Sequence, residues 1–177
     1  LKMLRGQGMD PKRRYYFPIT GYNFRLTNIA CAMLCAQLER RDEILYKREA
    51  IFAQYGAALS GIKGIGFQPV ASWAKIAPWL YSITVQPSEF GMTRDELIHT
   101  LSEEGIDSRP FFYPLHSLPP FAKEASQQGQ RLDETNQLAS TGLMLPTYND
   151  LSSSQIDRIA SLIRKASSST TSFRKVA

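Results

Sequence analysis

Gly21-Tyr22-Asn23-Phe24-Arg25-Leu26-Thr27-Asn28 is the stretch that decides how the chain is organised. A basic, aromatic arm precedes it, and a long segment with a recurring apolar stripe follows it. Thr27 or Asn28 can cap a helix, because each side chain offers an oxygen to the free N–H groups of a first turn. Asn23 and Arg25 therefore lie in a glycine-led loop just before a predicted helix.

The stretch 27–60 predicts a long helix. Leucine and aromatic residues recur along it at helical spacing, and Gly61 is well suited to end it. A helix of this length exceeds the usual size in globular proteins, so we expect a bend or break near residues 40–42. Alanines keep its first half slim, which suits a contact between subunits and ordinary packing within one chain equally well.

The chain has two cysteines, Cys31 and Cys35, which lie four residues apart on this predicted helix. Side chains at that spacing share one face of a helix. We expect both to be small, buried core residues in a reducing compartment rather than a disulfide.

Residues 1–26 predict an irregular arm. Glycine and proline interrupt it, and Arg13 and Arg14 stand directly before Tyr15-Tyr16-Phe17. Two interpretations remain open from the residues alone: a surface arm without a ligand, or a lining for an anion or nucleotide site. Tyrosine can also stack on bases, but one cluster without a recognised module is weak support for nucleic-acid binding.

Residues 61–166 predict a small α+β domain. Alternating side chains over 79–85 indicate a strand, a capping box at Thr93 starts a helix that Gly105 ends, and 106–112 indicates a second strand. This strand–helix–strand order predicts a right-handed crossover onto a small sheet.

The remaining segments are predicted from their prolines and from their helix-capping residues. The stretch 113–120 holds three prolines and is expected to form an irregular, shaped loop. A short helix is expected over 133–140, and a capping box at Ser152 starts a final amphipathic helix. The serine-rich tail, 167–177, is expected to be disordered.

Composition bounds the class of protein. The chain of 177 residues, with 43% hydrophobic and 21% charged residues, fits one globular domain with an appendage. No apolar run of about 20 residues and no signal peptide are visible, so we expect no membrane contact and a cytoplasmic protein. The two histidines and two cysteines show no zinc spacing, so no metal site is expected. The net charge of +5 suits an anionic ligand.

Composition and spacing alone name no reaction. Neither a Ser-His-Asp nor a Cys-His arrangement is supported, because both cysteines lie on an apolar helix far in sequence from either histidine. No catalytic residue is predicted within this chain.

Several motifs, in chain order, resemble the sugar-nucleotide aminotransferase family of the DegT/StrS type. They are Gly6-Gln7-Gly8-Met9-Asp10-Pro11, Tyr15-Tyr16-Phe17-Pro18, the Gly21–Asn28 stretch, Ala36-Gln37-Leu38-Glu39, Ser108-Arg109-Pro110-Phe111-Phe112-Tyr113-Pro114-Leu115-His116 and Leu145-Pro146-Thr147-Tyr148. Because the matches are spread over most of the chain, they are more specific than any one motif.

The resemblance implies an enzyme of the aspartate aminotransferase fold that uses pyridoxal 5'-phosphate. This chain would be its small C-terminal α+β domain plus the linking helix. The implied partners are a second copy in a homodimer, a nucleotide-diphosphate keto-sugar and glutamate as amino donor. The family's Schiff-base lysine is expected upstream of Asn23, so this chain alone is predicted to be inactive and not to hold the cofactor covalently.

The resemblance also implies roles for individual residues. Asn23 would reach the cofactor phosphate of the neighbouring subunit, the alternative being an asparagine that bonds its own backbone in a turn. Arg25 would orient that loop or add positive charge. The implied substrate-binding residues are His116, Arg13, Arg14 and Tyr16.

Two other hypotheses remain. The chain could be a non-catalytic assembly or binding domain of the same ancestry. It could also be a basic nucleic-acid binder, whose affinity would fall steeply with added salt. We predict no nucleic-acid partner.

Overall fold

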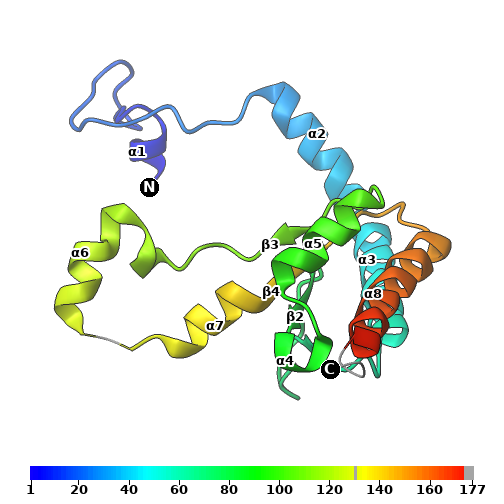
Figure 1. The fold of residues 1–177 in the computed structure, drawn as a ribbon. Coiled ribbons are helices and arrows are strands. Elements are labelled where there is room, and N and C mark those ends of the chain that lie inside the picture. Colours follow the sequence, from blue (N-terminus) through cyan, green and yellow to red (C-terminus); the bar gives the residue numbers. More distant parts are fainter. Residues whose placement is uncertain (130, 174–177) are drawn as a thin grey trace. The chain divides into compact units, whose positions relative to one another are not determined.

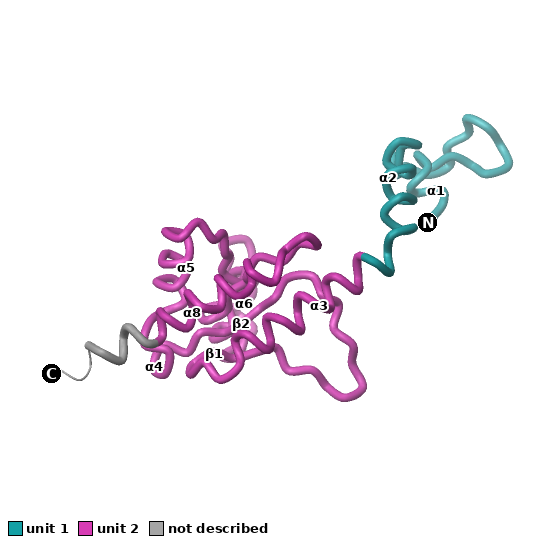
Figure 2. Tube along the Cα trace, turned by 90° about the vertical axis from the view of Figure 1, so that its right-hand side faces the viewer, with its two compact units in different colours: residues 1–43 teal, residues 44–177 magenta. Residues whose placement is uncertain are grey.

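The computed structural model describes residues 1–129 and 131–173, and it divides the chain into two compact units. Unit 1 is Leu1–Glu43 and unit 2 is Ile44–Ala177 (Figure 1 and Figure 2). The boundary lies in the first turn of helix α3, Arg41–Leu59. The predicted divisions lie after residues 26 and 60, where the predicted long helix begins and ends. The two units are instead defined by which residues contact one another.

Unit 1 contains a short helix, a looped segment and one longer helix. Helix α1 spans Lys2–Arg5 and helix α2 spans Asn28–Glu39. Thr27 is the N-cap of α2, and its hydroxyl accepts a hydrogen bond from the Ala30 N–H at 3.2 Å. The predicted cap is confirmed.

The predicted break in the long helix is also confirmed. Helix α2 ends at Glu39 and α3 begins at Arg41, with Arg40 between them at φ −95° and ψ 8°. The stretch 27–60 is therefore two helices rather than one.

The looped segment 6–24 of unit 1 doubles back on itself. The backbones of Gly6 and Asn23 form an antiparallel bridge. Gly8 has φ +83°, which favours glycine, and a Cβ on Gly21 would overlap the backbone of Gly8. Gly8 and Gly21 therefore allow the two backbone segments at the ends of the loop to approach closely. Asn23 lies at the C-terminal end of this loop.

Unit 2 is built on a four-stranded sheet in the order β1-β2-β4-β3, with every pairing antiparallel. The strands are β1 Ile65–Phe67, β2 Tyr81–Val85, β3 Arg109–Pro110 and β4 Gly142–Leu145. Because β4 lies between β2 and β3 and runs against both, β2 and β3 are parallel. Helices α4, Pro87–Phe90, and α5, Arg94–Glu103, connect them, so the predicted strand–helix–strand order is found.

The remaining elements complete unit 2. They are the 3₁₀ turn η1 Leu115–Ser117 and the helices α6 Pro119–Gln128, α7 Asp133–Thr141 and α8 Ser153–Phe173. Helices α3 and α8 lie side by side, and the Gln54 side-chain amide donates to Ser153 Oγ at 2.7 Å between them (Figure 1). Over residues 1–129 and 131–173, the structure contains no helix with the length and apolar character needed to cross a bilayer.

One face of the sheet carries the core. In β2, Tyr81, Ile83 and Val85 are buried, while the alternate residues Ser82 and Thr84 face the other side and are half-buried. Helices contribute much of the rest of this core through Ile51, Tyr55, Leu59, Leu97, Leu101, Ile156, Ile159 and Ile163. The opposite face of the sheet is left partly open.

Tyr55 is a polar anchor inside this core. Its hydroxyl donates to the Pro146 carbonyl at 2.9 Å, and its ring stacks on Tyr81 at 4.8 Å between centroids. Burial raises the pKa of the Tyr55 hydroxyl, and it also raises the pKa of Tyr81. Both groups are therefore held in their neutral, hydrogen-bonding form.

Both predicted capping boxes are confirmed. The Thr93 N–H donates to Glu96 Oε2 at 2.6 Å, and the Glu96 N–H donates to Thr93 Oγ1 at 3.3 Å. The Thr93 N–H and the Thr93 hydroxyl both donate to Glu96 Oε2, and these two bonds lower the pKa of the Glu96 carboxyl. At the start of α8, the Ser152 N–H donates to Gln155 Oε1 at 2.9 Å, and the Gln155 N–H returns to Ser152 Oγ at 3.3 Å.

The prediction for the cysteines is wrong in one respect. Cys31 and Cys35 are free, as expected, but both are exposed rather than buried. Helix α2 has no buried residue, because its apolar side chains surround the helix instead of forming one stripe against a core. Burial of the thiols was inferred from the residue type alone. No residue of α2 belongs to the buried core, so the two thiols stay exposed.

The prediction of an irregular loop over 113–120 is partly wrong. Pro114 precedes the turn η1, and Pro119 and Pro120 form the first turn of α6. Proline is tolerated there, because the N–H groups of a first helical turn have no intrahelical acceptor. The three prolines therefore start structure as well as interrupt it.

The strand predictions succeed only in part. The strand expected over 106–112 contracts to Arg109–Pro110, and β1 and β4 were not predicted. The segment of β4, Gly142–Leu145, is a short apolar run, which periodicity cannot distinguish from part of a helix. The helix expected over 133–140 is confirmed as α7.

The final helix is longer than predicted. Helix α8 continues to Phe173 through a serine-rich segment. This segment contains no proline or glycine that would end the helix. The tail expected over 167–177 overlaps this helix, and its last residues, 174–177, lie outside the part that the structure describes.

Candidate functional site

The predicted site residues fall in two groups, one in each unit. Unit 1 brings five of them onto the loop 10–25, and unit 2 carries the sixth. The unit 1 group is Arg13, Arg14, Tyr16, Asn23 and Arg25, and the unit 2 residue is His116.

Asn23 is exposed at the end of its loop. Its backbone is fixed by the bridge to Gly6, and its neighbours Tyr22 and Phe24 stack with centroids 5.3 Å apart. Within residues 1–129 and 131–173, the side-chain amide of Asn23 makes no hydrogen bond, including none to its own backbone. The amide donors are thus free to meet an acceptor from outside the chain.

The two adjacent arginines are held against tyrosine rings. The Arg13 guanidinium carbon lies 4.3 Å from the Tyr16 ring centroid, and that of Arg14 lies 4.9 Å from the Tyr15 centroid. Asp10 Oδ1 shapes this turn by accepting the Arg13 N–H at 3.0 Å. Stacking on a ring face orients an arginine while its N–H fork remains able to bind an anion.

The charge of unit 1 is concentrated in this arm. Residues 1–27 contain six basic and one acidic side chain, a net charge of +5, which equals that of the whole chain. The acidic residue, Asp10, already accepts backbone N–H groups. No ion pair joins residues 1–27 to any other described part of the chain. This arm therefore presents uncompensated positive charge, which favours phosphate groups.

His116 lies half-buried in the turn η1. The turn is closed by Ser117, whose N–H and hydroxyl both donate to the Pro114 carbonyl, at 3.0 and 2.8 Å. His116 Nε2 lies 2.9 Å from Oδ1 of Asn136, a residue of α7. One ring nitrogen of His116 therefore has a side-chain partner on another helix, 20 positions further along the chain.

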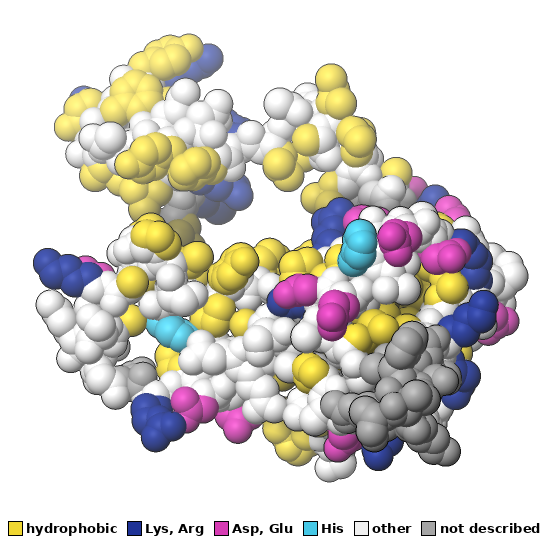
Figure 3. Space-filling view, in the orientation of Figure 1, with side chains coloured by type: hydrophobic (Ala, Val, Ile, Leu, Met, Phe, Trp, Pro, Cys, Tyr) yellow, Lys and Arg dark blue, Asp and Glu magenta, His cyan; other side chains and the backbone are white. Residues whose placement is uncertain are grey.

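An apolar hollow of about 460 Å³ opens on the uncovered side of the sheet. Its walls include Trp79, Phe111, Phe112, Leu138 and Met144. Figure 3 shows hydrophobic side chains gathered over the segment that carries β3 and the loop leading to η1. A pocket of this character is typical of ligand sites and of surfaces that another domain covers.

A second hollow, also about 460 Å³, is more polar. Ser108, Arg109, Tyr148 and Arg158 are among its lining residues. The hydroxyl of Ser108 is buried and has no hydrogen-bond partner in the part of the chain that the structure describes. The motifs Ser108–His116 and Leu145–Tyr148, which are distant in sequence, thus meet along this hollow.

Sequence reasoning missed Asn136, which contacts His116, and Arg94, which contacts the end of the helix that carries Asn136. Asn136 had been assigned only to a short helix, and Arg94 only to a capping box. Neither has a local signal for its contact, because Asn136 meets His116 across 20 positions and Arg94 meets the end of α7 across 45 and 48 positions.

Comparison with known proteins gives a family match over most of the chain. The model of the DegT/DnrJ/EryC1/StrS aminotransferase family matches residues 1–164. This range includes all of unit 1, most of unit 2 and all six predicted site residues.

Curated relatives agree with this match. Over 160 residues the chain is 41% identical to the GDP-perosamine synthase of Caulobacter vibrioides, covering 90% of this chain and 42% of that protein. It is 33% identical to the GDP-perosamine synthase of Vibrio cholerae, covering 91% of this chain and 43% of that protein. The chain therefore spans less than half the length of these relatives.

A solved structure agrees in fold. The crystal structure of DesV from S. venezuelae superposes with a TM-score of 0.82 at 29% identity, over 94% of this chain and 43% of that one. The expected fold class, an α+β portion of a larger aminotransferase, is confirmed.

Proposed function

The chain belongs to the DegT/DnrJ/EryC1/StrS aminotransferase family, and from this premise we propose that it is the C-terminal part of a sugar aminotransferase. The complete enzyme uses pyridoxal phosphate to transfer an amino group from glutamate to a keto-sugar carried on a nucleoside diphosphate. The observation that carries the proposal is the 41% identity to a GDP-perosamine synthase across 160 residues. That relative makes a guanosine diphosphate carrier the first substrate to test.

The basic loop of unit 1 fits the phosphate of the cofactor. Its amide and guanidinium donors are exposed, and residues 1–27 carry a net charge of +5. Asn23 would donate its amide N–H to a phosphate oxygen, and Arg25, two residues on, would add positive charge. Pyridoxal phosphate, when bound, supplies the electron sink for moving the amino group.

Four residues are proposed to bind the nucleotide sugar: Arg13, Arg14, Tyr16 and His116. Arg13 and Arg14, stacked on tyrosines, offer N–H forks to the diphosphate, and Tyr16 fixes the first of them. His116 borders the sugar, with Nε2 held by Asn136. These residues bind and orient the substrate, and we assign no bond-making step to them.

We propose that the active enzyme is a homodimer in which Asn23 acts on the partner's cofactor. Helix α2 supports this, because none of its residues is buried although most of them are apolar. Ile29, Met33 and Leu38 are 76%, 69% and 59% exposed. Exposed apolar side chains in this number mark an association surface.

The lysine that holds the cofactor is proposed to lie in the part of the relatives' length that precedes this match. This chain on its own would then neither trap the cofactor covalently nor transaminate. Reduction of a cofactor mixture with borohydride, followed by peptide mass analysis, tests this. A single modified lysine in the 177-residue chain would contradict it.

The test of the whole function uses the complete protein. Purified enzyme is mixed with pyridoxal phosphate, glutamate and a GDP-linked keto-sugar, and 2-oxoglutarate and the amino sugar are quantified. The expected result is equal amounts of both products. Absence of both with every nucleotide carrier tried would overturn the proposal.

A subunit-mixing experiment tests the action of Asn23 across the dimer. One variant carries Asn23→Asp, whose carboxylate repels phosphate, and the other lacks the cofactor-binding lysine. Each is expected to be inactive alone, whereas a random mixture regains about one quarter of wild-type activity, because half the dimers hold one complete site.

Two controls bracket the mixing experiment. Asn28→Asp changes another exposed asparagine, at the start of α2, and is expected to keep activity. If the mixture stays inactive while each variant remains dimeric, Asn23 serves its own subunit and the proposal of action in trans fails.

A further inference from the structure

We propose that Asn136 and Arg94 position His116, so that its ring presents Nδ1 as a hydrogen-bond acceptor to a hydroxyl group of the bound sugar. Arg94 fixes the end of α7, Asn136 extends from α7, and His116 lies against Asn136. The inference rests on the proposed function for the identity of the ligand, while the positioning itself rests on contacts within unit 2.

The contact with Asn136 determines where His116 carries its proton. Oδ1 of an amide only accepts hydrogen bonds, so His116 Nε2, 2.9 Å away, must donate. In the neutral ring, the other nitrogen, Nδ1, then has a free lone pair. A hydroxyl group, which can donate, is the natural partner for that nitrogen.

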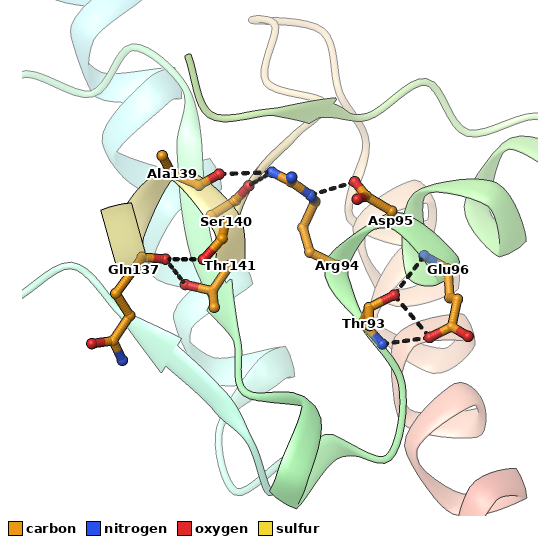
Figure 4. A network of polar contacts seen from close by, with 9 residues as sticks. Thr93, Arg94, Asp95, Glu96, Gln137, Ala139, Ser140 and Thr141 are labelled. Atoms are coloured by element: carbon orange, nitrogen blue, oxygen red, sulfur yellow. Dashed lines mark hydrogen bonds and ion pairs between the residues drawn. The ribbon is translucent and has the colours of Figure 1, made fainter. Parts of the chain in front are cut away.

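Asn136 can hold the ring only if α7 is itself held. Arg94 does this from α5, because its Nη1 donates to the Ala139 carbonyl at 3.1 Å and to the Gly142 carbonyl at 2.9 Å (Figure 4). Ala139 lies in the last turn of α7, where helical carbonyls lack intrahelical donors, and Gly142 is the C-cap residue at which β4 begins. The guanidinium thus bridges the end of α7 and the start of β4.

Arg94 is well suited to this role. Its side chain is only 12% exposed, and its Nε donates to Asp95 Oδ1 at 2.6 Å, which fixes the plane of the fork. The hydroxyls of Ser140 and Thr141, in the last turn of α7, bond within the helix, because both donate to the Gln137 carbonyl (Figure 4). Arg94 therefore supplies the polar tie between the end of α7 and α5.

The close fit at Gly142 adds to this tie. A Cβ at Gly142 would overlap the ring of Phe111 and the Leu138 carbonyl. The Phe111 N–H donates to the Gly142 carbonyl at 3.1 Å, so the segment that leads to His116 is fastened at the same point as α7. The two sides of the His116–Asn136 pair thus share one anchor.

The first test observes the ring directly in this chain. The chain has two histidines, so ring ¹H–¹⁵N spectra resolve His116 beside the exposed His99, which serves as an internal reference. We expect His116 to be protonated at Nε2, with slower exchange of that proton than in His99. Asn136→Leu should bring the exchange to the His99 rate, and Asn136→Asp, which keeps an acceptor, should restore the protection.

This measurement can overturn the proposal without any enzyme assay. Protonation of neutral His116 at Nδ1, or exchange that Asn136→Leu leaves unchanged, would exclude the positioning. Gln137→Leu is the matched control, since it makes the same change in polarity at the next residue of α7 and its side chain points away from Arg94 (Figure 4). It should leave the spectrum of His116 as in the wild type.

The second test uses the complete enzyme. Asn136→Leu is expected to raise KM for the nucleotide sugar about tenfold, the usual effect of losing one hydrogen bond, with kcat changed less than about twofold. Asn136→Asp should return KM toward the wild-type value, and Gln137→Leu should leave it unchanged. A wild-type KM in Asn136→Leu would contradict the proposal.

Arg94 is tested by coupling. Arg94→Met should raise KM in the same way, and adding Asn136→Leu should give less than the product of the two separate effects, because both act on one ring. Fully independent effects would show that Arg94 does not act through Asn136. If the wild-type enzyme makes no amino sugar, the proposed function fails, while the ring-proton measurement still decides the positioning.

Discussion

Unit 1 and unit 2 differ in how they treat apolar side chains. Every buried hydrophobic residue among those described lies between Ile51 and Ala166, within unit 2. Among residues 1–43, all of which are described, only Gly8 is buried. Unit 2 therefore has a core of its own, whereas unit 1 has apolar side chains that require a covering surface from elsewhere.

The units differ equally in charge. Residues 1–27 hold a net charge of +5, and the remaining 150 residues balance to zero. A region that exposes both apolar side chains and net charge is suited to contacts with other molecules rather than to forming a core. The difference supports our proposal that unit 2 supplies stability and that unit 1 supplies association and anion binding.

The largest expected effect is on the stability of unit 2. We compare the substitution of phenylalanine by alanine in unit 2 with the same substitution in unit 1. Phe90→Ala removes a ring that is 1% exposed and should lower the free energy of unfolding by about 3–5 kcal/mol. Phe24→Ala removes a ring that is 72% exposed and should change it by less than about 0.5 kcal/mol. Urea unfolding followed by circular dichroism measures both, and equal losses would contradict the division.

The next effect concerns association. Leu38→Glu places a charge on α2 and should weaken self-association of the complete protein about 100-fold, while unfolding of unit 2 is unaffected. Sedimentation velocity over a range of concentrations measures the dimer constant. Val70→Glu is the control, because Val70 is also exposed, at 52%, but lies in unit 2. A monomeric wild type would refute the assignment of α2 to a subunit contact.

Tyr55 gives unit 2 a dependence on alkaline pH. Its pKa is raised by burial in the folded state, so the unfolded chain releases the proton first. The contribution of Tyr55 is fully present below its unfolded pKa of about 10 and is lost as pH rises further. Tyr55→Phe should cost about 1 kcal/mol at neutral pH and reduce the fall in stability above pH 10.

Denaturant titrations at pH 7, 9, 10 and 11 check the Tyr55 prediction. Tyr46→Phe is the comparison, because Tyr46 is 74% exposed on the same helix. An identical alkaline decline in wild type and Tyr55→Phe would exclude Tyr55 as its source.

The smallest expected effect compares the two helix caps. Thr93→Ala removes the N-cap of α5 in unit 2 and should lower stability by about 1 kcal/mol. Thr27→Ala removes the N-cap of α2 in unit 1 and should leave the main unfolding transition unchanged, because α2 does not join the core. Thermal scans of both variants decide this. A larger loss in Thr27→Ala would show that unit 1 folds together with unit 2.

Helix boundaries could be predicted because their causes are local. Thr27, Thr93 and Ser152 cap helices through hydrogen bonds to residues three positions away. The break after Glu39 was likewise visible in the sequence as an overlong helix. The prolines at 119 and 120 misled, because the same ring that interrupts a helix also starts one.

The sheet and the surroundings of His116 could not be predicted in the same way. Strand β4 is a short apolar run whose identity comes from its two antiparallel neighbours. The exposure of Cys31 and Cys35 depends on what covers α2, and residue type carries no information on that.

The sequence by itself determined the family, the caps and the concentration of charge in the first 27 residues, because these depend on residue identity and on contacts a few positions apart. Only the tertiary structure decided the strand order, the apolar exposure of α2 and the alignment of Arg94, Asn136 and His116. The strand pairings join residues 16 to 64 positions apart, and the contacts of Arg94 and His116 join residues 20 to 48 positions apart. Such contacts form only once the chain has closed the loops between them.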